Sequence, residues 1–512
     1  MQDPYGLPQD PGSASPDPSA DRRPPTGKVP MPDLARTHHD LLVVGAGSAG
    51  LPVAISAAEA GASVLLVDKA DELGGSLLWT GGNMSAGGTR RQRARGIEDS
   101  AEAHLAEVME ISHGEVDVAL TRKAVLLAPA TIDWLEDNGF EFDPVTPAIT
   151  YAHHPYSVPR TYWGVRPGYS LFAVLERLVR PLLADGRVEL LLGSRVDELL
   201  VVGDRVVGVR AGGRELHAEH VVLATGGYTS NPELCARMSG GARPLSNGAH
   251  TSTGDGILLA ESVGAALAGL GVFVPTIGGF ADPADPTHAY STTTERLDRL
   301  PRLIPQLRPP WEVWVDDGGR RFVCEDEPDI YLREKAVSDA GLAFWVLWDE
   351  AVLDAAPRLV DAWDADDLRA LAAGGELIVA ADTVAGLAGR MGVPPAALEQ
   401  TVTAYNDAVR SGGPDPMGRV HRPLPLARPP FYAARQYGSS NLSWSGVKVD
   451  PDCAVLREDG TVVPGLYAVG EVLGSATFMG SAHVGGLSLV PALALGRQLG
   501  ATLGLRSTTP AG

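Results

Sequence analysis

The three glycines after the first apolar run constrain the fold of this chain more than any other feature. Residues 40–44 have the pattern of a buried strand, and Gly45, Gly47 and Gly50 follow in a GxGxxG spacing. An amphipathic helix and a second apolar strand come next. In such a unit the first glycine allows the turn, the second lets a pyrophosphate approach, and the third lets helix and strand pack closely. The pattern predicts a parallel βαβ unit that binds a dinucleotide at a helix N-terminus.

Acidic and glycine-rich positions further along the chain indicate which dinucleotide is bound. Asp68 ends the second strand 23 residues after Gly45, where an acid accepts hydrogen bonds from ribose hydroxyls and disfavours a 2′-phosphate. Glycines recur in DELGGSLLWTGGNMSAGGT, in HVVLATGGY and in GLYAVGE, where Glu471 is placed for hydroxyls on a ribityl chain. Dispersed contacts along one extended ligand favour FAD over NAD. The sequence also has no second GxGxxG that opens another βαβ unit.

Composition argues against several classes of function. The net charge of −21 disfavours binding to nucleic acid or to an anionic membrane, because both attract surplus Lys and Arg. The three cysteines form no CxxC, so no metal site is predicted and a reducing, cytoplasmic setting fits best. Residues 1–37 are rich in Pro, Asp, Ser and Gly and predict a disordered tail. No apolar run approaches the ~20 residues of a membrane helix.

Hydrophobic patterns predict the elements between these motifs. Residues 100–140 and 170–185 are predicted to be helical, and residues 380–411 to form two helices. Residues 188–225 predict a small antiparallel meander that returns to a parallel strand. The segment WEVWVDDGGRRFVCE (311–325) alternates on both sides of a DDGG turn and predicts a hairpin.

Seven motifs together resemble the fumarate reductase/succinate dehydrogenase flavoprotein family. They are VVGAGSAG, TGGNMSAGGT, VVLATGG, STGDG, GGRRFVCE, VPGLYAVGE and GGLSLVPALALGRQLG, and they extend over residues 38–505. The resemblance is to the soluble branch, which also holds urocanate reductase, tricarballylate dehydrogenase and ketosteroid dehydrogenases. It implies an α/β fold with a Rossmann-like FAD-binding domain split in sequence (38–270 and 435–507). An α+β capping domain (271–434) is inserted and covers the flavin, and a short tail (508–512) follows.

The resemblance also implies which residues hold FAD. Beside the three glycines of the first motif, the expected contacts lie in the glycine-rich segments and at strand ends: Ala49, Asp68, Lys69, Gly75, Ser76, Gly81, Gly82, Val196, Thr225, Gly226, Asp255, Glu471, Ser488 and Leu489. The helix after Gly485–Gly486 is expected to direct its N–H groups at the flavin pyrimidine edge and so to favour reduced flavin. Covalent relatives carry a histidine near the position of Gly75. None lies between Asp68 and Gly82, so FAD is expected to be bound non-covalently.

The resemblance places the catalytic proton transfer in the capping domain. Flavin N5 exchanges a hydride with one carbon of the substrate, and a protein acid or base handles the proton on the neighbouring carbon. In fumarate reductases an arginine after an RF(V/M)NE segment does this, and RFVCEDEPDIYLREKAV offers Arg333. Arginine is almost always protonated, so it needs a carboxylate neighbour to relay protons. The alternative is an exposed arginine paired with Glu327 or Glu334, and Tyr331 is a second catalytic candidate.

The substrate end departs from the dicarboxylate reductases at three positions. Their NRLGGN becomes AHVGGL, with His483 in place of an arginine. The segment NLSWSGV lacks their histidine, and Val274 replaces the histidine of their HPT. Imidazole is a weaker carboxylate anchor than a bidentate arginine, so fumarate and succinate are not the expected substrates. His483 is predicted to bind a carbonyl or a single carboxylate or to move protons, and the alternative is a packed histidine without a chemical role.

Apolar side chains are expected to line the cavity and favour a bulky cyclic or natural-product-like substrate, although each taken alone fits a core residue equally well: Trp79, Trp444, Phe478, Met479 and Leu487. The expected substrate contacts are Gly82, Gly486 and Tyr162, with Tyr156 as the alternative tyrosine. The ending GGLSLVPALALGR resembles tricarballylate dehydrogenase-like proteins and keeps a carboxylic acid substrate open.

These features together predict an FAD-dependent oxidoreductase that desaturates or reduces a C–C bond α,β to a carbonyl of a small-molecule substrate. The direction and the electron donor or acceptor stay open, and oxygen, a quinone, a small electron carrier and free reduced flavin all fit. One alternative is a flavin oxidase or hydroxylase that acts on an alcohol or amine. A second is a non-catalytic binding module with a flavoprotein fold.

Overall fold

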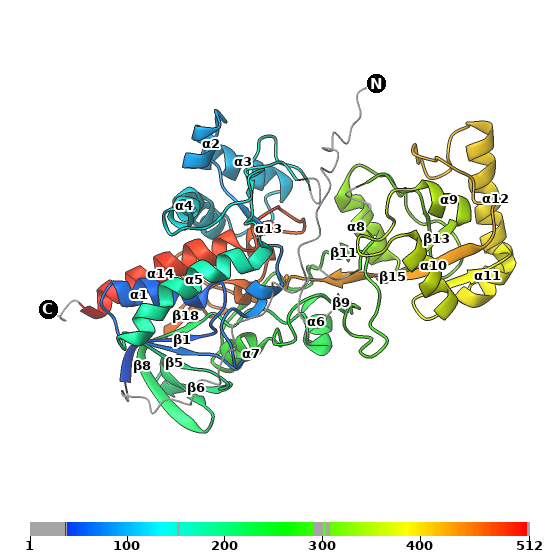
Figure 1. The fold of residues 1–512 in the computed structure, drawn as a ribbon. Helices are drawn as coiled ribbons and strands as arrows, with labels where there is room; N and C mark the ends of the chain where they lie inside the picture. The colour runs from blue at the N-terminus through cyan, green and yellow to red at the C-terminus, as the bar shows by residue number, and fades with distance from the viewer. Residues whose placement is uncertain (1–35, 37, 151–153, 291–300, 304–307, 509–512) are drawn as a thin grey trace.

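The computed structural model of the chain describes residues 36, 38–150, 154–290, 301–303 and 308–508. The predicted tails at both ends of the chain therefore lie almost entirely outside the described residues. The described chain forms two bodies, and the long strand β15 (Phe431–Ser440) extends from the second body toward the first (Figure 1).

The first body is built on a mostly parallel sheet. Strand β1 (His38–Val44) lies between β2 (Val64–Val67) and β8 (Arg214–Leu223) and runs parallel to both, with Leu42 opposite Leu65 on one side and Val221 on the other. In spatial order the sheet contains β17 (Ala454–Leu456), β18 (Val462–Ala468), β8 (Arg214–Leu223), β1 (His38–Val44), β2 (Val64–Val67) and β5 (Val188–Leu191). The predicted meander is confirmed, because β6 (Val196–Val202) and β7 (Arg205–Ala211) run antiparallel and lead into β8. The sheet and its helices confirm the predicted α/β fold.

Helices α1, α5 and α14 lie along one face of this sheet (Figure 1). A spacing of four residues places Gly496, Gly500 and Gly504 on the side of α14 that faces α1. A Cβ at Gly500 would lie 2.3 Å from the Val53 carbonyl oxygen, so the two helices pack backbone against backbone. The helices of this body are α1 (Gly50–Glu59), α2 (Arg90–Ala94), α3 (Ala101–Ile111), α4 (Val118–Asp137), α5 (Pro167–Ala184), α6 (Pro232–Met238), α7 (Asp255–Ser262), α13 (Ala476–Met479) and α14 (Val490–Thr508). Helices α3, α4 and α5 confirm the helices predicted there.

The second body has its own cluster of buried apolar side chains, from Ile277 to Ala434. Its sheet has the order β11-β15-β13-β12 with antiparallel pairs, β14 also pairs antiparallel with β15, and β9 pairs with β15 in parallel. The strands are β9 (Leu245–Ser246), β11 (Thr276–Ile277), β12 (Val313–Val315), β13 (Ala343–Asp349) and β14 (Ile378–Ala381). The helices are α8 (Ile330–Asp339), α9 (Glu350–Ala355), α10 (Ala365–Gly374), α11 (Val384–Met391) and α12 (Pro395–Ser411), of which α11 and α12 confirm the predicted pair.

Short elements complete the described chain and carry many of the predicted site residues. They are the single-turn helices η1 (Gly75–Trp79) and η3 (Glu471–Leu473) and the strands β3 (Met84–Ser85), β4 (Thr161–Tyr162), β10 (Leu267–Ala268) and β16 (Gly446–Val447).

The hairpin predicted over residues 311–325 does not form. The turn is present, since the Gly319 amide donates to the Asp316 carbonyl oxygen at 3.0 Å, but β12 pairs with β13 instead of with the segment after the turn. The second arm is irregular because the Glu325 carboxylate, 3.1 Å from the Trp314 amide nitrogen, accepts the hydrogen bond that a strand carbonyl would take. The alternation of apolar and polar residues over 311–325 therefore reflects burial of side chains around the Glu325 carboxylate, and not a second strand.

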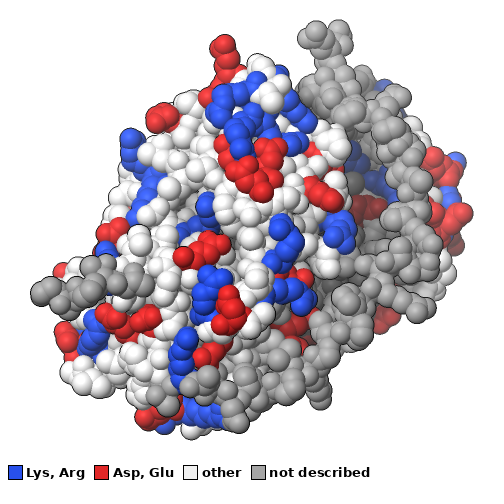
Figure 2. Space-filling model, turned by 60° about the vertical axis from the view of Figure 1, so that its left-hand side comes forward, with Lys and Arg blue, Asp and Glu red and all other residues white. Residues whose placement is uncertain are grey.

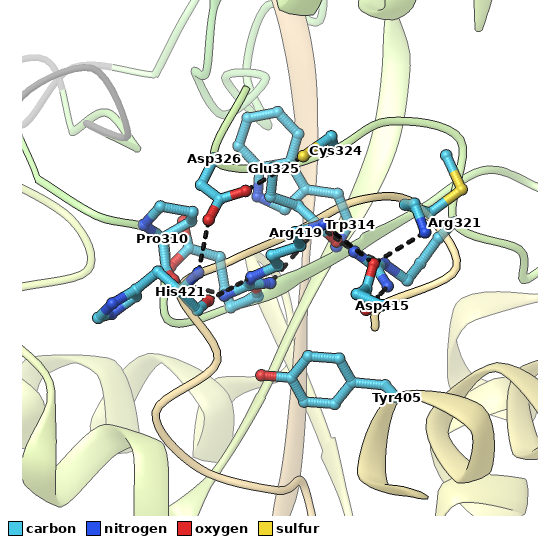
Figure 3. Close-up of polar contacts among 12 residues, drawn as sticks. Pro310, Trp314, Arg321, Cys324, Glu325, Asp326, Tyr405, Asp415, Arg419 and His421 are labelled. Carbon is cyan, nitrogen blue, oxygen red and sulfur yellow. Dashed lines mark hydrogen bonds and ion pairs between the residues drawn. The ribbon is translucent and has the colours of Figure 1, made fainter. Parts of the chain in front are cut away.

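That charged group belongs to a buried ionic network in the second body (Figure 3). Arg321 lies between two carboxylates, with Nε 2.9 Å from Glu325 Oε1 and Nη1 2.7 Å from Asp415 Oδ2. Arg419 is fully buried and lies 3.5 Å from Glu325, and Nη1 of Arg419 donates to the Glu312 carbonyl oxygen at 2.7 Å. Two guanidinium groups are thus neutralised by carboxylates inside the core, an arrangement that is costly to disturb.

The surface carries mixed charge. Figure 2 shows Lys and Arg interspersed with Asp and Glu across one face of the molecule. Such mixing is typical of a solvated surface. Within the part of the chain that the structure describes, no helix combines the length and apolar character that crossing a bilayer requires.

We predict that Asp415→Asn destabilises the protein by about 3 kcal/mol at pH 7, because it leaves the buried Arg321 with too little negative charge. Burial alone would raise the pKa of Asp415, but hydrogen bonds and charge from Arg321 hold that pKa below its usual range. Its stabilising contribution is therefore complete above the unfolded pKa and is lost as pH falls through the folded pKa. Urea unfolding between pH 7 and pH 2 measures this.

The matched control is Asp407→Asn, because Asp407 forms an exposed pair with Arg410. That variant should stay within about 0.5 kcal/mol of the parent protein. A difference between the Asp415 variant and the parent that does not shrink in acid would contradict the assignment.

Candidate active site

The first glycine loop, between β1 and α1, is shaped by backbone contacts. Gly45 has a φ of +106°, and a Cβ there would lie 2.2 Å from the Ala224 carbonyl oxygen. A Cβ at Gly50 would lie 1.8 Å from the Gly45 carbonyl oxygen. Neither position has room for a side chain, so these two glycines let α1 approach the ends of β1 and β8.

The middle glycine of the motif borders open space instead. A Cβ at Gly47 would meet only the Gly74 carbonyl oxygen, at 3.7 Å. The amides of Gly47, Ser48 and Ala49 donate no hydrogen bond to any described residue. Unpaired N–H groups at a helix N-terminus, beside a position without a side chain, form a cradle for phosphate oxygens. The residues present therefore fit the pyrophosphate of FAD.

Asp68 is fixed against this loop by two backbone amides. Its Oδ2 accepts a hydrogen bond from the Ala46 amide at 2.7 Å, and its Oδ1 accepts one from the Ala70 amide at 2.8 Å. Burial raises the pKa of Asp68, and the two amides oppose that rise. The carboxylate is thus held at the end of β2, where the sequence predicts a ribose contact.

The glycine-rich segment after β2 lies beside the first loop. A Cβ at Gly75 would lie 3.8 Å from the Gly47 Cα, and Ser76 Oγ lies 3.2 Å from Ser252 Oγ. Gly75 begins η1, so its backbone and that of Gly47 face each other across a narrow gap. Two segments predicted to contact FAD from separate parts of the sequence are therefore adjacent in the fold.

Two further glycines lie at the end of the same segment. Gly82 has a φ of +73° and packs on the start of α5, where a Cβ would lie 3.0 Å from the Pro167 carbonyl carbon. A Cβ at Gly81 would meet only Asn83 Nδ2, at 3.9 Å. Gly82 is thus required by packing, whereas Gly81 borders open space.

A charged cluster joins β2, β6 and α7. Lys69 Nζ lies 2.8 Å from Asp255 Oδ2 and 2.5 Å from Thr253 Oγ1, and Arg195 Nη2 lies 3.0 Å from Asp255 Oδ1. Burial alone would raise the pKa of Asp255, but Lys69 and Arg195 lower it. The cluster brings the predicted contacts Lys69, Asp255 and Val196 together, since Val196 directly follows Arg195.

Glu471 is held at the ends of the central strands. It begins η3 after β18, is half-buried, and its Oε1 accepts a hydrogen bond from the Ser443 amide at 2.9 Å. Burial raises the pKa of Glu471. A Cβ at Gly227 would lie 2.4 Å from Glu471 Oε1. Beside it, Gly226 has open space in place of a side chain, and the buried Thr225 Oγ1 has no hydrogen-bond partner among the described residues. The hydroxyl groups of a ligand could form hydrogen bonds with Thr225 Oγ1 and with the Glu471 carboxylate here.

The turn before α14 exposes backbone donors. The amides of Gly486, Ser488 and Leu489 donate no hydrogen bond within the described part of the chain. Leu489 is buried, and buried amides without partners are rare in folded proteins. Helix α14 begins at Val490, so its N-terminal end adds a partial positive charge here. These donors fit the pyrimidine edge of a flavin, which accepts hydrogen bonds and becomes negative when the flavin is reduced.

Helix α8 of the second body reaches this same turn. Glu334 Oε1 lies 3.1 Å from His483 Nδ1, and both side chains are only 6% exposed. The Trp444 ring packs edge-on against the His483 ring, with centroids 5.0 Å apart. Arg333, the neighbour of Glu334, is also buried at 6% exposure. An exposed arginine, the alternative for Arg333, is therefore wrong.

The tyrosines proposed for the site differ in their placement. Tyr331 is half-buried, and its ring lies 6.0 Å from that of His113 on the first body. Tyr162 is fully buried in β4, and its hydroxyl lies 2.6 Å from Thr89 Oγ1. The Tyr162 hydroxyl thus has a partner inside the core, and its contact with substrate stays a prediction.

Sequence reasoning gave no functional role to Ser443 or Glu334. Ser443 fixes Glu471 through its backbone amide, which leaves no residue-type signal. Glu334 lies in REKA, beside the arginine that the motif singles out, and was considered only as a surface partner of Arg333. The position of Glu334 directly after Arg333 in this motif is the sequence signal from which its role could have been predicted.

We predict that Gly47→Ala leaves the fold intact but weakens FAD binding, because the added methyl enters the open space above the loop. Overpacking costs about 1–3 kcal/mol, so the dissociation constant should rise by about ten- to a hundredfold. Absorbance at 450 nm after dialysis measures bound FAD, and thermal unfolding of the FAD-free proteins measures the fold.

Gly389→Ala is the matched control, because a Cβ there meets nothing within 4 Å in the second body. Gly50→Ala should instead lower the stability of FAD-free protein. Normal FAD affinity in the Gly47 variant would show that no ligand occupies the loop.

Comparison with known proteins identifies the family. The family model described as FAD binding domain matches residues 40–489. A probable fumarate reductase of Shewanella frigidimarina is 30% identical over 476 residues, which cover 90% of this chain and 74% of that protein. The 3-oxosteroid 1-dehydrogenase of Mycobacterium tuberculosis is 26% identical, with 89% of this chain and 96% of that protein covered.

Solved structures agree on the fold. The open conformation of a flavocytochrome c3 fumarate reductase superposes with a TM-score of 0.71 at 28% identity, covering 92% of this chain and 79% of that one. The 3-ketosteroid Δ1-dehydrogenase of Sterolibacterium denitrificans superposes with a TM-score of 0.74 at 20% identity and covers 92% of this chain and all of that one. The chain belongs to the FAD-binding flavoprotein family that includes the fumarate reductases and the 3-ketosteroid dehydrogenases, and FAD is its cofactor.

Proposed function

We propose that this protein is an FAD-dependent oxidoreductase that desaturates or reduces a C–C bond α,β to a carbonyl, on a bulky cyclic or natural-product-like substrate. The observation that carries the proposal is the contact between His483 and Glu334, which joins the helix α8 to the turn before α14. When bound, FAD supplies hydride exchange at its isoalloxazine ring. We further propose that the second body is the capping domain and that the protein works in the cytoplasm. Its three cysteines are unpaired thiols, which suits that compartment.

His483 and Glu334 are suited to hold and move a proton. A carboxylate on Nδ1 fixes the tautomer and the orientation of the imidazole. Nε2 is then the ring atom that takes or gives a proton. The two side chains are buried, so little water competes for that proton. His483 follows the apolar segment Phe478–Met479 and packs on Trp444, which keeps the ring in one orientation.

Arg333 is the neighbour of Glu334 on α8, is buried, and is proposed to supply a fixed positive charge to the site. Its guanidinium stays protonated and stabilises negative charge that develops on a substrate carbonyl oxygen. A proton passes through arginine only with a carboxylate nearby, and Glu334 is its sequence neighbour in the same buried turn of α8. Tyr331 is the other proposed proton donor. It is half-buried and lies in the first turn of α8.

The charge at this end of the site favours a ketone over a dicarboxylate. Glu334 places a carboxylate on His483, the residue that stands where the dicarboxylate reductases have an arginine, and like charges in a buried site repel each other. Trp444 provides an apolar wall that suits a ring system. Among the relatives, the 3-oxosteroid 1-dehydrogenase acts, by its name, on a ring ketone, and the same substrate class is proposed here.

The first prediction from this proposal concerns the contact between His483 and Glu334. His483→Gln should lower the turnover number on a cyclic ketone by about a hundredfold, since general acid–base groups contribute 10²–10⁴. Glu334→Gln should lower it less, because the amide still contacts Nδ1 while the stabilising charge is lost. Anaerobic stopped-flow at the flavin absorbance, with a 3-ketosteroid and with fumarate, measures both.

Glu399→Gln is the control for this experiment, because Glu399 is exposed on α12 and distant in the fold from α8. Rapid reoxidation of reduced enzyme by fumarate, with no reaction on any ketone, would overturn the substrate class. Unchanged turnover in the His483 variant would remove that residue from the chemistry.

The second prediction concerns the attachment of FAD. No histidine lies between Asp68 and Gly82, so acid precipitation should release all the flavin into the supernatant. The visible spectrum of supernatant and pellet measures this. Yellow colour that stays with the precipitated protein would show a covalent bond.

A further inference from the structure

A buried tyrosine lies directly behind the paired glycines. Tyr156 is 3% exposed, and its hydroxyl oxygen lies 2.8 Å from the Gly485 carbonyl oxygen and 3.3 Å from His104 Nε2. Ser85 Oγ is also near, at 3.4 Å. Three segments that are distant in sequence thus meet at one phenol, and Gly485 belongs to the turn that exposes backbone donors.

The ring of Tyr156 is fixed on both sides. The His104 ring lies edge-on to it with centroids 5.2 Å apart, and the Arg160 guanidinium lies 5.6 Å from its centroid. Arg160 is itself held by Asp99 through two hydrogen bonds of 2.7 Å. These contacts hold the Tyr156 ring in place and so fix the position of its hydroxyl oxygen.

The direction of these hydrogen bonds follows from proton count. A carbonyl oxygen only accepts, so the single phenol proton of Tyr156 is donated to Gly485. His104 must then donate from Nε2 to the phenol oxygen. Burial lowers the pKa of His104 to about 3 and raises that of Tyr156, so the imidazole is neutral and the phenol protonated at neutral pH. The chain runs from His104 through Tyr156 to the Gly485 carbonyl.

That carbonyl controls where the next amide points. The peptide is planar and trans, so the Gly486 N–H lies opposite the Gly485 C=O. A peptide between two glycines has the widest conformational freedom in a chain, so contacts must fix its orientation. Gly486 is held on one side by β3, where a Cβ would lie 2.4 Å from the Ser85 amide nitrogen. Tyr156 supplies the second constraint.

We propose that Tyr156, supported by His104, is a positioning residue that aims the Gly486 amide and the turn before α14 at the flavin. The inference rests on the binding of FAD at this turn. Amides aimed at the flavin edge that becomes negative stabilise the reduced cofactor more than the oxidised one. Tyr156, named with Tyr162 as a possible substrate contact, thus acts through the backbone and on the reduction potential.

The test is the midpoint potential of FAD in Tyr156→Phe, measured by anaerobic dye equilibration on the holoenzyme. We expect the ratio of affinities for reduced and oxidised FAD to fall about tenfold, which lowers the two-electron potential by about 30 mV. Tyr405→Phe is the matched control, because Tyr405 is an equally buried phenol that donates to a backbone carbonyl, that of Leu424 at 3.2 Å, in the second body. The midpoint potential of FAD in the Tyr405→Phe variant should equal that in the parent protein.

Two variants of His104 keep the inference testable if the Tyr156 variant does not fold. His104→Gln retains an N–H donor toward the phenol and should keep the parent potential, whereas His104→Leu removes the donor and should lower it. An unchanged potential in the Tyr156 or His104→Leu variant, with FAD bound, would overturn the inference. A parent protein that binds no FAD would instead overturn the proposed function.

Discussion

The close approach of backbones at glycine determines the architecture of the FAD-binding body. Gly50 lets α1 start against β1, and the glycines of α14 let that helix lie against α1 with no side chain between them. Because the two helices pack so closely, both of their N-terminal ends reach the same edge of the sheet (Figure 1). Two sets of amides without partners among the described residues, one before α1 and one before α14, are thus available there, and we propose that both face FAD.

The contact between His483 and Glu334 has a different character, since it joins the two bodies through side chains. Each residue lies in a motif of its own body, Glu334 in REKA and His483 in AHVGGL, and both side chains are only 6% exposed. Removing either partner of a buried hydrogen bond leaves the other polar group without its partner, which is costly. The pair therefore links α8 of the second body to the segment before α14, and we propose that it ties the chemistry of the site to the placement of the second body.

The sequence was informative where backbone geometry demands a residue type. The GxGxxG loop, the meander and the helix pair of the second body were predictable because their signals lie within a few tens of residues. His483 and Glu334 are 149 residues apart, and no local pattern links them. The hairpin at 311–325 was mispredicted because the carboxylate of Glu325 replaced a strand partner.

This division also explains how one fold serves relatives that bear the names of fumarate reductases and 3-oxosteroid dehydrogenases. The proposed cofactor contacts are largely amides and absent side chains, which tolerate substitution elsewhere as long as the glycines remain. The proposed substrate end depends instead on side chains such as His483, Glu334 and Trp444. Where an arginine is replaced by His483, a carboxylate on α8 completes the polar group instead. Fold and cofactor are then set by one kind of interaction and substrate choice by another.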